Sequence, residues 1–131
     1  MNLYSVLNAF IMMSAKTKKT VMVVILERRR IVMRLWVDDV RPAPEGYTWC
    51  HSVYRVIKEV QIAEMNSETI ELIDLDHDAG DYWQYGGDYI AVLDWLEETG
   101  RNYPIRIHSM NPVGVQNMRA IIQKNGWMEV R

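Results

Sequence analysis

The chain has 131 residues, a net charge of −2 and 49% hydrophobic residues, which suits one domain with a sizeable core and leaves little room for two. Residues 1–32 hold six basic residues against one acid, whereas residues 33–131 hold nine against sixteen. A domain this acidic repels a nucleic-acid backbone, so no broad nucleic-acid groove is expected. Cys50 has no cysteine to pair with, and no apolar run is long enough to span a membrane, so a cytoplasmic protein without membrane contact is expected.

The first 32 residues differ from the rest in charge and lack a clear helical period. We expect little order there, apart from a short strand or helix near Thr20–Leu26. If Arg28 and Arg29 are encoded AGG-AGG, they form a bacterial ribosome-binding site three codons before an ATG at Met33. We therefore favour translation from Met33 and a mis-assigned extension before it. The alternative is a genuine basic arm. Other arginine codons at these two positions would remove the argument for a ribosome-binding site.

From residue 33 onward, strand-like and helix-like patterns alternate. Short apolar runs bounded by turn residues predict five strands, at 34–37, 47–50, 69–75, 105–108 and 127–130. Helical spacing of apolar residues predicts helices from Ser52 to about Met65, from about Asp88 to Thr99, and from a cap at Asn111 to a stop at Gly126. This alternation predicts a three-layer, doubly wound α/β domain with a five-stranded parallel sheet in the order 2-1-3-4-5.

Side chains capable of chemistry come directly after the first, third and fourth predicted strands: Asp38, Asp39, Asp76, His77, Asp78, His108 and Ser109. These strands are neighbours in the predicted order, so their carboxyl ends meet at one edge of the sheet. Because buried charges are costly unless paired or metal-bound, clustered acids indicate chemistry rather than packing. Carboxylates bind Mg²⁺ or Mn²⁺, Asp with His also suits Zn²⁺, and histidine is a general acid or base near neutral pH.

Each of these residues also has a structural explanation. Asp38 and Asp39 are alternatively loop acids that cap backbone amides, and His108 is alternatively a core histidine with satisfied hydrogen bonds. Asn111 is explained by helix capping, although the amides at this helix start, up to Gly114, also form an anion site.

The loop after the third strand is rich in aromatic residues, and its role stays open. Tyr82, Trp83 and Tyr85 either stack on a base or form a hydrophobic lid without a ligand. His51, at a helix start, is interpreted as a surface or capping residue. Asp74, inside the third strand, is interpreted as structural.

Three stretches resemble one known family: LWVDDVRPAPEGYTW at 35–49, LIDLDHDAG at 72–80 and PIRIHSMNPVGVQNMRAII at 104–122. They are similar to the cyclic-phosphate processing receiver-like domains of bacteria and their phages, a divergent branch of the response-regulator receiver domains. The resemblance spans nearly all of residues 33–131. It implies a receiver-like (flavodoxin-like) fold and an activity on cyclic phosphate ends, in RNA repair or nucleotide metabolism.

By motif, the resemblance places Asp38 and Asp39 at the acidic metal-binding pair of a receiver and Ser109 at its Ser/Thr. Asp76 or Asp78 falls at the phosphorylated aspartate. Receivers carry a lysine after the fifth strand, whereas this chain has none there and adds two histidines. The departure favours hydrolysis over phospho-relay.

The residues and the resemblance together predict a metal-assisted phosphoesterase for a cyclic phosphodiester, such as a 2′,3′-cyclic phosphate of RNA or a nucleotide. The expected roles are divalent-cation (Mg²⁺ or Mn²⁺) binding by Asp38, Asp39 and Asp76, acid–base catalysis by His77 and His108 with Asp78, and phosphate binding by Ser109, Asn111 and Gly114. The alternative is a receiver-like module that accepts phosphate on Asp76 or Asp78 or senses a nucleotide. A third interpretation is a phage or mobile-element protein that binds a host factor.

Overall fold

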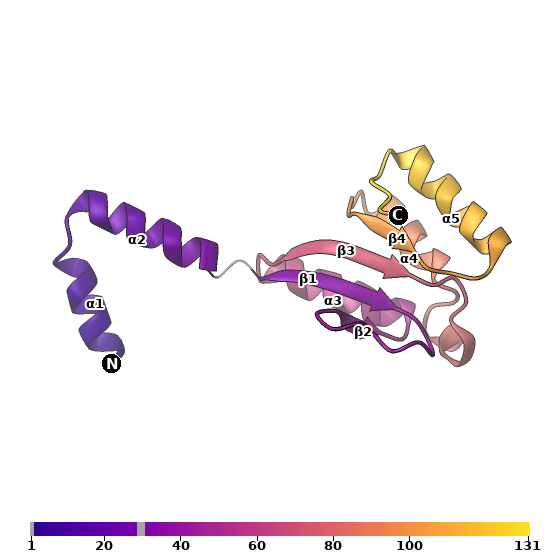
Figure 1. Cartoon of the computed structure of the whole chain (residues 1–131), viewed down its shortest axis with the longest axis horizontal. Coiled ribbons are helices and arrows are strands. Elements are labelled where there is room, and N and C mark those ends of the chain that lie inside the picture. Colours follow the sequence, from indigo (N-terminus) through magenta and orange to yellow (C-terminus); the bar gives the residue numbers. More distant parts are fainter. Residues whose placement is uncertain (1, 29–30) are drawn as a thin grey trace. The chain divides into compact units, whose positions relative to one another are not determined.

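A computed structural model describes residues 2–28 and 31–131, which divide into two units, Met1–Ile31 and Val32–Arg131 (Figure 1). In the first unit, helix α1 (Leu3–Ile11) forms where the sequence pattern had favoured little order, and α2 (Ala15–Arg28) contains and extends the short element expected near Thr20–Leu26. Each helix is capped by a polar residue at its start. The side chains of Asn2 and Ser14 accept hydrogen bonds from the backbone amides three residues further on, at 2.8 and 3.2 Å. Arg29 and Arg30 of the basic run lie outside the described residues, and the start of translation at Met33 stays a prediction.

The second unit is built on a parallel sheet whose strands follow the order β2-β1-β3-β4 (Figure 1). The strands are β1 (Val32–Val37), β2 (Thr48–Cys50), β3 (Thr69–Leu75) and β4 (Ile105–Ile107). The predicted fifth strand, at 127–130, does not form. Within this segment, Glu129 makes only an isolated parallel bridge with Ile105. Two hydrogen bonds hold this terminal segment beside β4, from Ile105 N to Met128 O (2.9 Å) and from Val130 N to Ile105 O (2.8 Å). The last segment therefore follows β4 through a single bridge and does not form a strand ladder.

The helices of this unit begin and end close to their predicted positions. Ser52 caps α3 by accepting a hydrogen bond from the amide of Arg55 at 3.1 Å, and Gly126 ends the last helix in the left-handed conformation. A 3₁₀-helix, η1, forms in the aromatic loop after β3. No helix among residues 2–28 and 31–131 combines the length and apolarity that crossing a membrane requires. The bounds are α3 Val53–Met65, η1 Gly80–Tyr85, α4 Ile90–Glu98 and α5 Pro112–Asn125.

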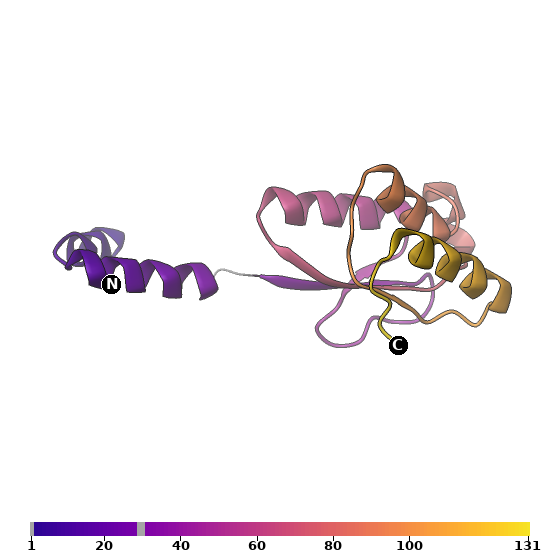
Figure 2. The same cartoon turned by 90° about the horizontal axis from the view of Figure 1, so that it is seen from above.

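The domain has two layers instead of the predicted three. Figure 2 shows α3, α4 and α5 on one side of the sheet and the loop between β1 and β2 on the other. That loop, residues 38–47, contains Pro42 and Pro44, which disfavour a helix there, so no helix of residues 32–131 covers this face. Instead the loop packs on the sheet itself: Trp36 donates its indole N–H to the carbonyl of Arg41 at 2.8 Å and meets the ring of Tyr47 edge-on.

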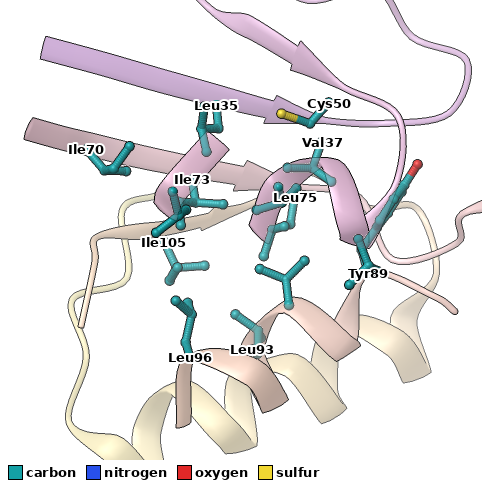
Figure 3. Close-up of a cluster of buried hydrophobic side chains, with 14 of the residues drawn as sticks. Leu35, Val37, Cys50, Ile70, Ile73, Leu75, Tyr89, Leu93, Leu96 and Ile105 are labelled. Atoms are coloured by element: carbon teal, nitrogen blue, oxygen red, sulfur yellow. The ribbon is translucent and has the colours of Figure 1, made fainter. Parts of the chain in front are cut away.

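The hydrophobic core lies between the sheet and the helices (Figure 3). Alternate strand residues such as Leu35, Ile73 and Ile105 point into it and meet Leu93 and Leu96 of α4, all fully buried. Burying each such side chain contributes about 1.5–3 kcal/mol, so this layer holds the strand ends in place. Cys50 is part of this core, and burial raises the pKa of its thiol to about 12, which keeps the thiol protonated at neutral pH.

Candidate functional site

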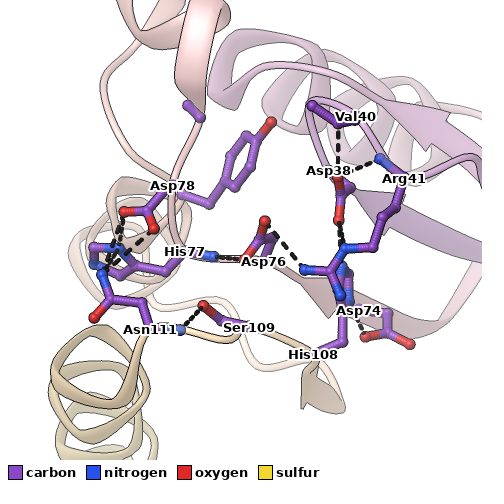
Figure 4. A network of polar contacts seen from close by, with 12 residues as sticks. Asp38, Val40, Arg41, Asp74, Asp76, His77, Asp78, His108, Ser109 and Asn111 are labelled. Carbon is purple, nitrogen blue, oxygen red and sulfur yellow. Dashed lines mark hydrogen bonds and ion pairs between the residues drawn. The ribbon is translucent and has the colours of Figure 1, made fainter.

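Three strand ends converge at the carboxyl edge of the sheet, as predicted. Asp38, Asp76 and His108 each donate the backbone amide to a carbonyl of the neighbouring strand, at 3.3, 2.9 and 2.8 Å respectively. The sheet pairing therefore continues one residue past β1, β3 and β4, and the side chains that follow emerge side by side (Figure 4).

Three carboxylates meet at this edge, and we call Asp38, Asp39 and Asp76 the acid cluster. Each offers an oxygen, and these oxygens all lie within 4.8 Å of one another. Asp38 is buried, and the side chain of Asp76 is 13% exposed. Asp39 lies against the backbone of Gly80, where a Cβ atom would overlap the carboxylate, so this approach requires glycine.

The carboxylate of Asp38 is the most constrained group of the acid cluster. Its Oδ1 accepts hydrogen bonds from the amides of Val40 (2.9 Å) and Arg41 (2.7 Å), and its Oδ2 lies 2.9 Å from Nε2 of His108. Burial by itself would raise the pKa of Asp38, but these hydrogen bonds and the nearby Arg41 guanidinium together lower it. Asp38 is therefore an anion at neutral pH.

Arg41 is a residue of the site that the sequence analysis missed. Its guanidinium lies 3.1 Å from Oδ2 of Asp38 and 3.5 Å from Oδ2 of Asp76, and so connects the ends of β1 and β3 (Figure 4). The available signal was its position, because it follows Asp38 and Asp39 within the same short loop.

Asp39 has the opposite electrostatic character. Burial, followed by the charges of Asp38, Asp76 and Asp81, raises its pKa above the usual value. The acid cluster therefore holds more negative charge than Arg41 balances. Hard carboxylate oxygens at this spacing are a donor set that Mg²⁺ or Mn²⁺ prefers, so the residues present fit a divalent cation.

This difference predicts opposite effects of charge removal on the metal-free protein. Because the pKa of Asp39 is higher folded than unfolded, its ionisation lowers the free energy of unfolding as the pH rises above about 4. We expect Asp39→Asn to raise that free energy at pH 7, by less than about 1 kcal/mol, with no gain at pH 3. Asp38→Asn should lower it, because a lowered pKa contributes stability above about pH 4 that is lost as the pH falls through it. Urea titrations at both pH values, with Asp94→Asn as an exposed control, test this; a less stable Asp39→Asn would contradict it.

His108 contacts the acid cluster through Asp38 and contacts Asp74 with its other ring nitrogen. Its Nδ1 lies 2.6 Å from Oδ1 of Asp74 and its Nε2 lies 2.9 Å from Oδ2 of Asp38, while its ring stacks on Trp36 with centroids 3.8 Å apart. Both ring nitrogens are therefore engaged, and this geometry favours holding Asp38 over activating water. Asp74, interpreted from the sequence as structural, is the buried second partner.

His77 belongs to a second group, on the α5 side of the site (Figure 4). Its amide donates to Oδ1 of Asp76 at 2.8 Å, which links the two groups, but its ring turns toward Asp78, with Nδ1 and Oδ1 2.8 Å apart. The side-chain amide of Asn111 lies 3.4 Å from the Asp78 carboxylate. Asp88 also offers a ligand atom to this group, although its Oδ1 accepts the amide of Ala79. The two predicted acid–base histidines therefore do not pair with each other.

The predicted phosphate-binding residues lie at the start of α5. Asn111 caps the helix, because its side-chain oxygen accepts a hydrogen bond from the backbone amide of Gly114 at 3.0 Å. The backbone amide of Asn111 donates to the hydroxyl of Ser109 at 3.1 Å. The interpretation of Asn111 as a helix cap is therefore confirmed. The helix start still presents partial positive charge beside the third and fourth strand ends.

Gly114 allows the ring of His77 to lie directly on the first turn of α5, since a Cβ atom there would overlap the imidazole. Replacing glycine by alanine in a helix ordinarily stabilises a protein by about 0.5–1 kcal/mol. We expect Gly114→Ala to have the opposite sign and to cost about 1–3 kcal/mol, because the ring must move. Urea unfolding and the His77 NMR signals measure both effects. Gln116→Ala, exposed in the same helix, is the matched control, and a stabilised Gly114→Ala would contradict the prediction.

Comparison with known proteins adds one match. A family model described as the cyclic-phosphate processing receiver domain matches residues 33–124. The chain belongs to this family. No curated protein and no solved structure matches the chain at a significant level. The resemblance inferred from the three sequence stretches is thus confirmed, and both groups of site residues lie inside the matched range. In this cyclic-phosphate processing receiver domain, the acid cluster stands where the three motifs meet.

Proposed function

We propose that this domain is a metal-assisted phosphoesterase that opens a cyclic phosphodiester to a phosphomonoester. The acid cluster carries the proposal: three carboxylate oxygens within 4.8 Å of one another, from two strand ends, in a family defined by cyclic-phosphate processing. Clustered carboxylates repel one another, so the arrangement favours a bound cation. Mg²⁺ or Mn²⁺ held by Asp38, Asp39 and Asp76 would neutralise phosphate charge and stabilise the leaving oxygen.

The residues around the acid cluster suit the remaining parts of the reaction. The hydroxyl of Ser109 supplies a hydrogen-bond donor for a phosphate oxygen, and the start of α5 supplies partial positive charge beside it. His77 is the candidate general base, since its Nδ1 faces Asp78, which orients the ring and leaves Nε2 to accept the proton of the attacking water. The water oxygen bonds to phosphorus, one ring P–O bond breaks, and the released alkoxide takes a proton from solvent. His108 is a positioning residue in this scheme, acting through Asp38.

The alternative of a phosphate-accepting module has less support. Asp76 follows β3 where a receiver has its phosphoacceptor, but its Oδ2 faces Arg41 and its Oδ1 already accepts the amide of His77. Among the described residues, the segment beside β4 has no lysine to contact a phosphoryl group. These contacts disfavour the transfer of a phosphoryl group to Asp76.

The direct test is hydrolysis of uridine 2′,3′-cyclic phosphate by the full chain with Mg²⁺, with Mn²⁺ and with a chelator. We expect cation-dependent release of a uridine monophosphate. A parallel incubation with acetyl phosphate, followed by intact mass measurement, tests the alternative. A stable gain of one phosphoryl group without hydrolysis would replace the proposal by the signalling module.

A further inference from the structure

Beside the acid cluster lies a hollow that the proposed chemistry does not use. It has a volume of about 530 Å³ and is lined by Trp49, His51, Ser52, Arg55, Tyr82 and Tyr85. We call it the aromatic pocket. Its rings follow one another in contact: the centroids of Trp49 and His51 are 4.4 Å apart and stacked, and those of His51 and Tyr82 are 5.0 Å apart. Tyr85 continues the row, 6.4 Å from Tyr82.

Two connections fix the aromatic pocket next to the acid cluster. The indole N–H of Trp49 donates to the backbone carbonyl of Asp38 at 2.7 Å. On the other side, η1 begins at Gly80, which packs on the carboxylate of Asp39, and two residues later it places Tyr82 in the pocket wall. One short helical segment therefore contributes to both sites.

The far end of η1 is held equally closely. Gly86 has a φ of +117° and packs against Val53 at the start of α3, where a Cβ atom would overlap the Val53 side chain. The tyrosines are thus held between the acid cluster and the residues that precede and begin α3, Ser52 among them. A pocket held at both ends binds a ligand without first having to order its own walls.

We infer that the aromatic pocket binds the base of a nucleoside whose cyclic phosphate reaches the acid cluster. The inference rests on the proposed function and names its substrate class, a terminal nucleoside 2′,3′-cyclic phosphate. Aromatic faces suit any base through stacking, and the hydroxyl of Ser52 and the guanidinium of Arg55 supply polar partners at the rim. Because residues 33–131 are strongly acidic, the pocket fits one terminal nucleoside rather than a long polynucleotide track.

Aromatic cages also bind quaternary ammonium groups, so the choice of ligand needs an argument. Arg55 places a cation in the pocket wall, although it pairs with Glu59 at 2.6 Å. A second cation beside it would be repelled, whereas a neutral base is not. The mixed polar and aromatic lining likewise suits a base, which presents a flat face and hydrogen-bonding edges.

The test separates base binding from catalysis by using nucleosides without phosphate. The full chain is titrated with uridine and with adenosine while the indole N–H signal of Trp49 is followed by NMR. We expect both to shift this signal, and tetramethylammonium not to. Tyr82→Ala should weaken binding about tenfold. Trp83→Ala, a 62% exposed neighbour in η1 outside the pocket, should not. Tyr85→Ala, at a 48% exposed position, repeats the test with less risk to folding.

A kinetic arm uses a substrate that lacks the base. The ratio of kcat/KM for uridine 2′,3′-cyclic phosphate to kcat/KM for glycerol 1,2-cyclic phosphate should fall about tenfold in Tyr82→Ala but not in Trp83→Ala. Nucleoside binding without hydrolysis of either ester would refute the proposed function and leave the pocket standing. Hydrolysis of both esters, with no nucleoside binding and an unchanged ratio, would overturn the pocket and leave the function. A response to tetramethylammonium alone would also overturn it.

Discussion

Asp76→Asn is expected to lower cyclic-phosphate hydrolysis by more than about 100-fold, because losing a residue that merely supports a metal ligand already costs 10–100-fold. Asparagine keeps an oxygen for the amide of His77 but removes the charge that the acid cluster offers to a cation. The loss should therefore appear as weaker cation binding together with a lower kcat. Initial rates over a range of Mn²⁺ concentrations, and calorimetric titration with Mn²⁺ alone, measure the two effects.

The control for this variant is Asp94→Asn, which removes the same charge from an exposed position on α4. It should change neither cation affinity nor rate beyond a small effect of net charge. Full activity in Asp76→Asn, with unchanged Mn²⁺ binding, would show that the acid cluster is not the cation site.

His108→Ala is expected to lower the free energy of unfolding by about 3–5 kcal/mol, the usual cost of leaving a buried charge without its partner. The substitution leaves the buried Asp74 carboxylate without its 2.6 Å partner and removes one of several donors to the buried Asp38 carboxylate. It also opens the face of Trp36 on which the imidazole stacks. Urea unfolding at pH 7 gives the measurement. His51→Ala is the matched control, because its ring contacts Trp49 and Tyr82 rather than buried acids.

A double-mutant cycle separates the charge effect from lost packing. If the cost arises from a stranded carboxylate, adding Asp74→Asn to His108→Ala should recover part of it, so that the two substitutions are not additive. Strict additivity, or a cost in His108→Ala no greater than in His51→Ala, would mean that the imidazole does not hold the carboxylates together.

The helices were readable from the sequence for local reasons, and the sheet order followed from the alternation of strands and helices. Ser52 and Asn111 cap helices whose apolar residues recur at helical spacing, and Gly126 ends α5. The fifth strand and the third layer were predicted wrongly. Strand formation at 127–130 depends on how far the segment pairs with β4, and a layer depends on whether some helix covers a face; neither property is encoded locally.

The strand order predicted which residues gather at the carboxyl edge, and the structure places them there. The strand order did not predict how their side chains are oriented. His77 and His108 were expected to act as a pair, yet one ring turns to Asp78 at the start of α5 and the other is held between Asp38 and Asp74. Arg41 was missed because only the folded loop carries its guanidinium back to Asp76.

The order of residues along the chain was sufficient to define the family, the parallel sheet and the edge at which its acids gather, since periodicity and strand sequence are properties of a linear pattern. It was not sufficient to assign partners. Whether an imidazole faces water or a buried carboxylate, and whether an aromatic loop encloses a pocket, depends on rotamers and contacts between segments many residues apart, and these arise only when the core packs.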